Sequence, residues 1–204
     1  MRKLLKRTVL LISILLVFPG FVLTRLDWLL GDDAMFVFMS QALSTMPGLP
    51  GNYLRLAYYV LTLKRIGKDV LISIGSVFSK PSAEVGNHVN IGAYCVIGDV
   101  RLGDHVLIAS RVSLMSGKYQ HGSALVSAPA SGESRISIGS RTWVGEGAIV
   151  ASDVGSDCIV GAGSVVMRNV PDGYMAAGNP AKVIRMDRGA AAAQAPDETT
   201  VTPS

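Results

Sequence analysis

Hydrophobic positions recur every six residues over the longest part of the chain. The clearest stretch, residues 138–165, reads IGSRTW, VGEGAI, VASD, VGSDCI and VGAGSV, with an aliphatic residue followed by a small one. This period fits neither the 3.6-residue helix nor a two-residue strand alternation, and a fixed short repeat is typical of a solenoid. The pattern therefore predicts a β-solenoid whose backbone turns a corner in each six-residue unit.

The same six-residue step begins near residue 66 and is interrupted once. Eight units run to Leu114, and the step resumes at Ile136 or Ile138. The residues between are rich in Gly and Ser and lack the period, and structureless segments of this length in a compact domain are usually functional or disordered. We expect a solenoid over residues 66–170 with a protruding loop over residues 115–135.

The repeat also predicts how each unit packs. The aliphatic first residue points inward, while the small second and fifth residues let the backbone turn without colliding with the neighbouring coil. Three units make one triangular coil, and stacked coils continue a parallel sheet on each of three faces at about 4.8 Å per rung. Cys95 and Cys158 both occupy the fifth position of a unit, so we expect buried free thiols rather than a disulfide.

Residues 1–65 carry most of the apolar excess and are expected to form a membrane-associated helical leader. Basic residues precede the run TVLLISILLVF, which ends at Pro19-Gly20. A cleaved signal peptide, a single membrane span and a bent segment within one leaflet all fit this pattern. We favour the bent segment, which would break at Pro19-Gly20 and return over residues 25–33.

A second apolar run covers residues 34–46, and residues 52–65 read NYLRLAYYVLTLKR. Leu54, Tyr58 and Leu61 share one face at helical spacing, and tyrosines lie beside cationic residues that include Arg55. This is typical of an amphipathic helix at a membrane interface, and equally of a helix that caps a solenoid. The two roles are compatible.

Composition narrows the classes of function. The chain has 204 residues, of which 49% are hydrophobic and 17% charged, and its net charge is +4. Because no basic run is interleaved with aromatic residues, we expect no nucleic-acid partner. Residues 171–188 read as a closing segment, and residues 189–204 lack core-forming side chains, so we expect a disordered tail.

Several motifs together resemble the hexapeptide-repeat acyltransferases, in particular sugar O-acetyltransferases. They are the six-residue units, the segments TWVGEGAIV and VGAGSVVMRNVP, and the closing GNPAKVIR, and they cover residues 66–185. The resemblance implies a left-handed parallel β-helix that assembles as a homotrimer, with acyl-coenzyme A (acyl-CoA) in the groove between adjacent prisms. The handedness is implied by the resemblance alone.

The resemblance also implies a set of site residues. His121 would be the general base, since an imidazole with a pKa near 6.5 can take the proton of a hydroxyl that attacks a thioester. Residues around His121 would shape the acceptor pocket, and a second group would bind CoA. The acceptor group comprises Ser116, Lys118, Tyr119 and Gln120. The CoA group comprises Glu146 and Ala162 beside the pantetheine arm, and Met167, Arg168, Lys182 and Arg185 toward the nucleotide.

Two alternatives stay open. His88 and His105 are seventeen residues apart at the fourth position of their units, so they should stack on consecutive rungs. Two stacked histidines would suit a metal protein resembling the γ-class carbonic anhydrases. The usual close pair of histidines five residues apart is missing, however, and we expect no metal. The other alternative is a structural scaffold tethered to a membrane.

The sequence thus favours an acetyl-CoA-dependent O-acetyltransferase. The acceptor would be a sugar hydroxyl in the assembly of a cell-surface polysaccharide or glycolipid. Because acyl-CoA is cytoplasmic, we expect the catalytic domain on the cytoplasmic side of the membrane and residues 1–65 in its inner leaflet.

Overall fold

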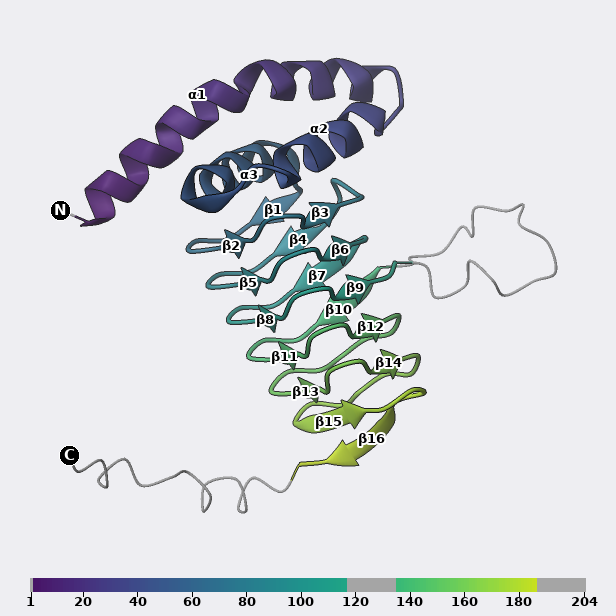
Figure 1. Cartoon of the computed structure of the whole chain (residues 1–204). Coiled ribbons are helices and arrows are strands. Elements are labelled where there is room, and N and C mark those ends of the chain that lie inside the picture. Colours follow the sequence, from purple (N-terminus) through teal and green to yellow (C-terminus); the bar gives the residue numbers. More distant parts are fainter. Residues whose placement is uncertain (1, 117–134, 187–204) are drawn as a thin grey trace, which may run out of the picture.

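Short strands stack into triangular coils and form a column with helices at its amino-terminal end (Figure 1). The structure is a computed structural model that describes residues 2–116 and 135–186. Within these residues, three helices precede sixteen strands. The predicted fold, a left-handed parallel β-helix, is confirmed.

The strands form three sheets, one on each face of the prism, which we call sheets A, B and C. Sheet A contains β1 (Arg65–Ile66), β4 (Glu84–Val85), β7 (Val100–Leu102) and β10 (Ile136–Ile138). Sheet B contains β2 (Leu71–Ile72), β5 (Asn90–Ile91), β8 (Leu107–Ile108), β11 (Trp143–Val144), β13 (Ile159–Val160), β15 (Tyr174–Ala177) and β16 (Lys182–Arg185). Sheet C contains β3 (Val77–Phe78), β6 (Val96–Ile97), β9 (Ser113–Leu114), β12 (Ile149–Val150) and β14 (Val165–Val166).

Each six-residue unit places its residues as the repeat predicts. In β11, Trp143 points outward and is 45% exposed, whereas Val144 is buried in the column. Val144 lies in parallel register between Ile108 and Val160, so aliphatic side chains stack from coil to coil. Cys95 and Cys158 are buried and free, which confirms their prediction.

The shortened unit VASD weakens one strand. Sheet A has no strand at this level among the described residues, and Val154 makes only single parallel bridges to Ile138 and Val170. Because this unit is two residues short, the coil forms an isolated bridge at Val154 instead of a strand, and the stack continues.

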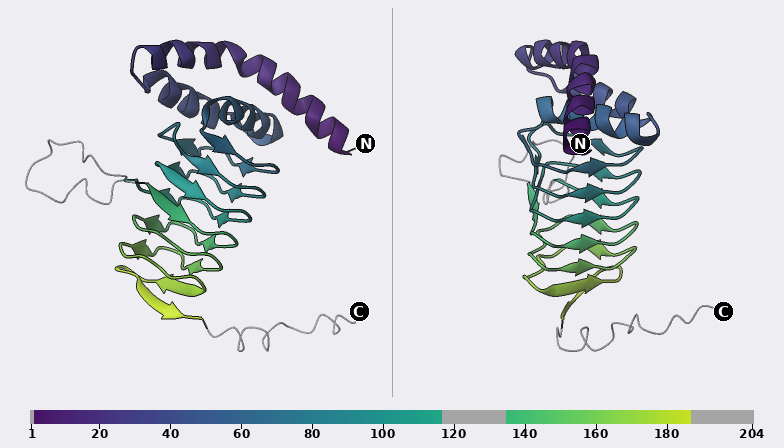
Figure 2. Two further views of the ribbon diagram at one scale, coloured as in Figure 1. Left: turned by 180° about the vertical axis from the view of Figure 1, so that it is seen from behind. Right: turned by 90° about the vertical axis from the view of Figure 1, so that its left-hand side faces the viewer.

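Helix α1 (Arg2–Leu29) runs without interruption through Pro19, so the predicted break at Pro19-Gly20 is wrong. A proline removes one backbone hydrogen bond from a helix, and the other bonds of this long helix persist. Gly20 lies against Met39, and a Cβ at Gly20 would be 2.3 Å from Cε of Met39, so a larger residue would displace the end of that side chain. The chain reverses instead after Leu30, where α2 (Ala34–Ser44) follows (Figure 2).

Helix α3 (Gly48–Thr62) caps the first coil together with α2. Tyr59 is buried, its ring centroid lies 4.8 Å from that of Phe78, and its hydroxyl is 2.6 Å from Oγ of Ser40. Ser40 also donates to the backbone carbonyl of Phe78. Helices and solenoid therefore share one hydrophobic core.

Arg55 is fully buried, so of the two roles expected for residues 52–65 it serves the cap on the solenoid rather than a membrane interface. Its Nη1 donates to the carbonyls of Leu43 (3.0 Å) and Met46 (2.7 Å), and its Nε donates to the carbonyl of Ile72 (3.0 Å). The carboxyl end of a helix leaves carbonyl groups without partners, and this guanidinium supplies the donors. Arg55 therefore joins α2, α3 and β2.

Replacing Arg55 by alanine should destabilise the protein by about 3 kcal/mol or more, because buried carbonyls lose charged donors and a cavity remains. Thermal or urea unfolding of the full chain measures the change. The matched control is Arg65→Ala in β1, an exposed position where the change should stay within about 0.5 kcal/mol. Equal stability of the two variants would contradict the assigned role of Arg55.

Candidate functional site

The predicted CoA residues Glu146 and Ala162 occupy one corner of the prism, between sheets B and C, which we call corner BC. They lie on consecutive coils, and the N–H of Gly163 donates to the carbonyl of Glu146 at 2.8 Å. Glu146 precedes β12 and Ala162 precedes β14. The repeat thus brings two residues sixteen positions apart to adjacent rungs.

Glycines leave the backbone of corner BC accessible. Gly147 and Gly163 adopt positive φ angles of 68° and 66° at the fourth position of their units. A Cβ at either position would meet no atom within 4 Å. A ligand can therefore approach the main chain here more closely than at corners that carry side chains.

Ser116, Met167 and Arg168 lie at the corner between sheets C and A, which we call corner CA. The N–H of Met115 donates to Val150, and that of Ala151 donates to Val166, so three successive coils stack here. Ser116 is half-buried, whereas Met167 is 66% exposed. Ser116 and the Met167-Arg168 pair therefore share one corner, with one coil between them.

Lys182 and Arg185 lie at opposite ends of β16. Lys182 pairs with Ala177, whose neighbour Ala176 accepts a hydrogen bond from Gly161 next to Ala162. Arg185 pairs with Tyr174, about 10 Å further along the strand. The structure brings Lys182 to corner BC with Glu146 and Ala162, but it places Arg185 toward the other edge of sheet B.

Arg111 is a member of corner BC that the sequence reasoning missed. Its guanidinium forms a close ion pair with the carboxylate of Glu146, and both side chains are largely exposed. Arg111 holds the fourth position of the unit IASRVS, and the N–H of Gly147 donates to its neighbour Ser110. The register of the repeat is the signal that identifies it.

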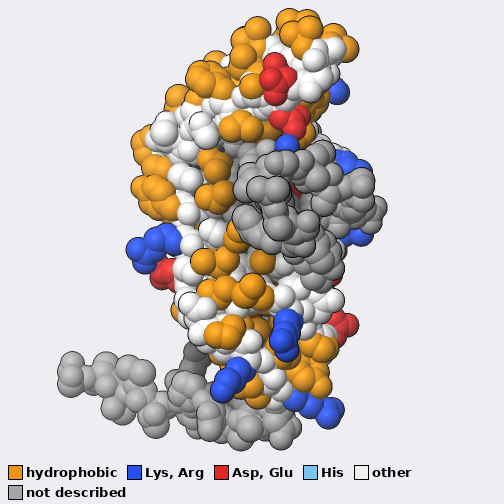
Figure 3. Space-filling view, turned by 90° about the vertical axis from the view of Figure 1, so that its right-hand side faces the viewer, with side chains coloured by type: hydrophobic (Ala, Val, Ile, Leu, Met, Phe, Trp, Pro, Cys, Tyr) orange, Lys and Arg blue, Asp and Glu red, His pale blue; other side chains and the backbone are white. Residues whose placement is uncertain are grey.

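Between the two corners, the outer surface of sheet C is apolar. Val96 is 51% exposed and Ile149 is 37% exposed, and both point away from the core. Figure 3 shows hydrophobic side chains gathered along the side of the molecule that carries this sheet. Cations and accessible backbone thus border an apolar surface.

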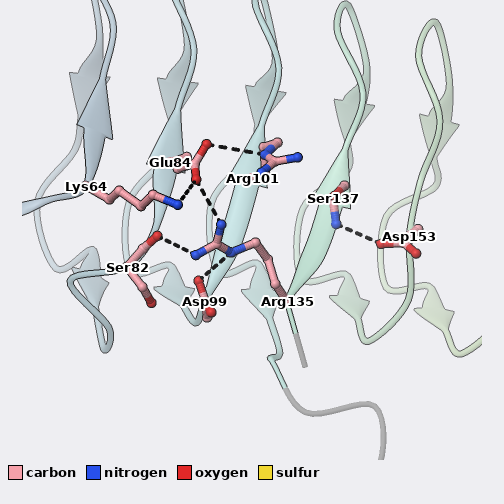
Figure 4. A network of polar contacts seen from close by, with 8 residues as sticks. All are labelled: Lys64, Ser82, Glu84, Asp99, Arg101, Arg135, Ser137 and Asp153. Atoms are coloured by element: carbon pink, nitrogen blue, oxygen red, sulfur yellow. Dashed lines mark hydrogen bonds and ion pairs between the residues drawn. The ribbon is translucent and has the colours of Figure 1, made fainter. Parts of the chain in front are cut away.

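The predicted base lies outside the described residues, and so do Lys118, Tyr119 and Gln120. The first described residue after this segment, Arg135, is firmly held (Figure 4). Its Nη1 lies 2.8 Å from Glu84, its Nε lies 2.9 Å from Asp99, and its Nη2 donates to the carbonyl of Ser82 at 2.8 Å. The chain therefore returns to sheet A at a fixed point, Arg135. No sequence motif predicted these contacts.

Glu84 is the centre of this cluster. It lies 2.8 Å from Nζ of Lys64 and 3.3 Å from Nε of Arg101, besides its pair with Arg135. The hydrogen bond from Lys64 is the largest of the effects that lower the pKa of Glu84 to about 2, and Arg101 adds to it. Its carboxylate is therefore ionised in the folded protein even in moderately acidic solution.

The predicted stacking of His88 on His105 is confirmed, with ring centroids 4.8 Å apart. Nδ1 of His88 lies 3.8 Å from a carboxylate oxygen of Asp69. Across residues 2–116 and 135–186, no three side chains of His, Cys, Asp or Glu gather as metal ligands.

Glu84→Gln should lower stability at pH 7 by on the order of 1 kcal/mol, allowing for solvent screening. Because the folded pKa lies below the unfolded value, this contribution is present above about pH 4.3 and lost as the pH falls toward about 2. Urea unfolding of wild type and variant at pH 7 and pH 2.5 measures it, with Glu146→Gln as control. A difference as large at pH 2.5 as at pH 7 would contradict this ionisation.

Comparison with known proteins identifies relatives of the solenoid. The chain is 33% identical over 124 residues to the "Putative lipopolysaccharide biosynthesis O-acetyl transferase WbbJ" of Escherichia coli K12, covering 54% of this chain and 61% of that protein. It is 32% identical over 130 residues to the "Putative colanic acid biosynthesis acetyltransferase WcaF" of the same strain, covering 59% and 68%. The chain thus spans less than two thirds of the first relative.

Among solved structures, a galactoside acetyltransferase in complex with coenzyme A superimposes with a TM-score of 0.57. The match covers 73% of this chain and 79% of that chain at 23% identity, and at this identity it supports the fold. No protein-family model matches the chain.

Proposed function

Because the chain belongs to the hexapeptide-repeat acetyltransferases, we propose that it transfers an acetyl group from acetyl-CoA to a sugar hydroxyl. The names of WbbJ and WcaF associate those proteins with lipopolysaccharide and colanic acid biosynthesis. The acceptor proposed for this chain is accordingly a sugar of a cell-surface polysaccharide or glycolipid.

This proposal rests on the arrangement of corner BC and sheet C in the last coils of the solenoid. CoA combines a slender, mostly apolar pantetheine arm with phosphate groups that prefer cationic partners. The apolar surface at Ile149 suits the arm, and the open backbone at Gly147 and Gly163 allows it to lie close to the main chain. Lys182 at one corner and Arg168 at the other supply cations.

The proposed chemistry assigns proton transfer to His121. The imidazole takes the proton of the sugar hydroxyl as its oxygen attacks the thioester carbonyl. The carbon–sulfur bond then breaks, and the departing thiolate takes the proton from the imidazolium. Arg135 holds the carboxyl end of the segment that contains His121, which makes it a positioning residue in this scheme.

The faces of the prism support a homotrimer. Sheets B and C carry outward apolar residues, which include Leu107 and Trp143 on B and Ile149 on C. Sheet A carries charged residues instead, with Glu84 and Arg101 paired on it. A closed threefold ring buries two different faces of each subunit and leaves the third in water. We therefore assign sheets B and C to the subunit interface and sheet A to the solvent.

Helix α1 supports attachment to a membrane. Its segment Lys6–Leu29 is the one helical stretch among the described residues that is long and apolar enough, by length and composition, to cross a bilayer. Its inner face packs on α3, where Oγ1 of Thr24 lies 2.8 Å from the hydroxyl of Tyr58. The outer face exposes Leu11, Ile12, Leu15, Leu16, Phe18 and Leu23.

We propose that α1 lies in the plane of one leaflet, because crossing the bilayer would require it to separate from α3. Since acyl-CoA is cytoplasmic, this leaflet would be the inner one. The active site would then lie where lipid-linked sugars are assembled.

His121→Ala should lower acetyl transfer by about 100-fold or more, because general base catalysis contributes about that factor. Thiol release from acetyl-CoA with a panel of sugar acceptors measures turnover, and calorimetry measures CoA binding, which should be unchanged. The control is His88→Ala at the corner between sheets A and B, with wild-type turnover expected. Equal turnover of His121→Ala and wild type would remove His121 as base. A wild-type chain that fails to bind CoA would favour a structural scaffold.

Leu15→Lys should reduce membrane binding by tenfold or more. Leu15 is 74% exposed, so folding is retained while burial of one leucine, worth about 2 kcal/mol, is lost. Vesicle sedimentation of the full chain measures binding, and Gln41→Lys at an exposed position of α2 is the control. Unchanged sedimentation of Leu15→Lys would contradict an outer face embedded in lipid.

A further inference from the structure

A cleft of about 630 Å³ lies where the leader meets the first coil. The end of α1 and the turn into α2 form one side of it, and the segments before β1 and β4 form the other. Its lining includes Arg25, Trp28, Asp32, Lys64, Pro81 and Ser82. It lies at the opposite end of the column from β14 and β16 (Figure 1), and among the described residues it touches the cluster around Arg135 only through Ser82 and Lys64.

The acidic residues of this cleft already have partners. Oδ1 of Asp32 accepts hydrogen bonds from the N–H groups of Asp33 (2.7 Å) and Ala34 (3.2 Å) at the start of α2. The carboxylate of Asp33 lies 3.3 Å from Nζ of Lys80. Asp33 is therefore paired with a cation, and the carboxylate of Asp32 faces the backbone N–H groups at the start of α2.

Two donor groups of residues that line the cleft have no hydrogen-bond acceptor among the described residues. The guanidinium of Arg25 stacks on aromatic rings, 5.1 Å from the centroid of Trp28 and 5.3 Å from that of Phe21, and meets no carboxylate among the described residues. The indole N–H of Trp28 is buried and has no hydrogen-bond partner within the described part of the chain. Such a buried donor costs free energy, but a ligand oxygen reaches it only if the indole moves, so the exposed guanidinium of Arg25 is the group that favours an anion here.

Lys64 can supply a second cation if it gives up its hydrogen bond to Glu84. Its Nζ lies 2.8 Å from Glu84, and its side chain is 59% exposed at the edge of the cleft. Glu84 also pairs with Arg101 and Arg135, so its carboxylate keeps two cationic partners if Lys64 turns toward a ligand. An anion in the cleft would then meet Arg25 on one side and Lys64 on the other.

The surroundings of the cleft indicate where such an anion comes from. Leu26, Leu29 and Leu30, at the same end of α1, are 52%, 83% and 86% exposed. These side chains continue the apolar outer face of the helix, so the cleft lies beside a surface suited to acyl chains. A ligand that joins an anionic group to acyl chains satisfies both features.

We propose that this cleft binds the phosphate group of a membrane lipid, with Arg25 and Lys64 as its cationic partners. The phosphate oxygens accept hydrogen bonds from the guanidinium, which matches their geometry well. The lipid's chains lie along Leu26 and Leu29. This site does not depend on the acyl-transfer chemistry.

The test uses the full chain in uncharged detergent micelles with Trp143→Phe, which leaves Trp28 as the sole tryptophan. Dihexanoyl phosphatidic acid is titrated while Trp28 fluorescence is recorded. Saturable binding is expected, with Kd raised tenfold or more in Arg25→Ala and by a smaller factor in Arg25→Lys, which keeps the charge but loses the guanidinium geometry. Lys68→Ala, an exposed cation on the first coil outside the cleft, should bind as the parent protein does.

Three results would overturn the proposal. Unchanged binding by Arg25→Ala would exclude Arg25 as a partner. Equal affinity for dihexanoylglycerol, which lacks the phosphate, would reduce the cleft to an apolar surface. Equal affinity for inorganic phosphate would identify a free anion rather than a lipid as the ligand. Circular dichroism of Arg25→Ala verifies its fold, and Arg25→Gln replaces it if the alanine variant is unstable.

Discussion

Close stacking of each coil on the next is the constraint on which the rest of the molecule depends. A Cβ at Gly67 would lie 2.3 Å from the carbonyl oxygen of Gly86, so the second position of a unit must stay small. The fourth position turns in the left-handed region, as at His105 with φ of 59°, and the fifth side chain is buried. The small second residue and the left-handed fourth residue are therefore steric requirements of the stacking.

This stacking also determines how a site can be built. Residues at equivalent positions of adjacent coils lie on adjacent rungs, so Arg111, Glu146 and Ala162 align along one corner, although 35 residues separate Arg111 from Glu146. Such a surface is rigid and offers exposed backbone and side chains in fixed register, which suits a long, narrow ligand. Acid–base chemistry needs a group that projects over that surface. In the proposed scheme His121, in the segment that interrupts the ladder, supplies this group, and Arg135 at the return to sheet A is held by Glu84 and Asp99.

The sequence predicts the solenoid well because its signal is local and repeated many times. Contacts made once, between distant segments, are harder to predict. Arg55 looks like an interfacial cation until α2 is seen to end beside it. Pro19 looks like a break, but the helix tolerates it within a well-packed leader. The partners of Arg135 are more than thirty residues away in the chain, and no spacing rule connects them.

Hydrogen–deuterium exchange of the full chain with and without CoA tests most directly whether the stacked rungs of corner BC hold the cofactor. Slower exchange is predicted on CoA binding at the backbone amides of residues 145–147 and 161–163, with residues 66–75 unchanged. Bound CoA that leaves the amides of corner BC unaffected, or slows exchange only in the leader, would contradict the assignment.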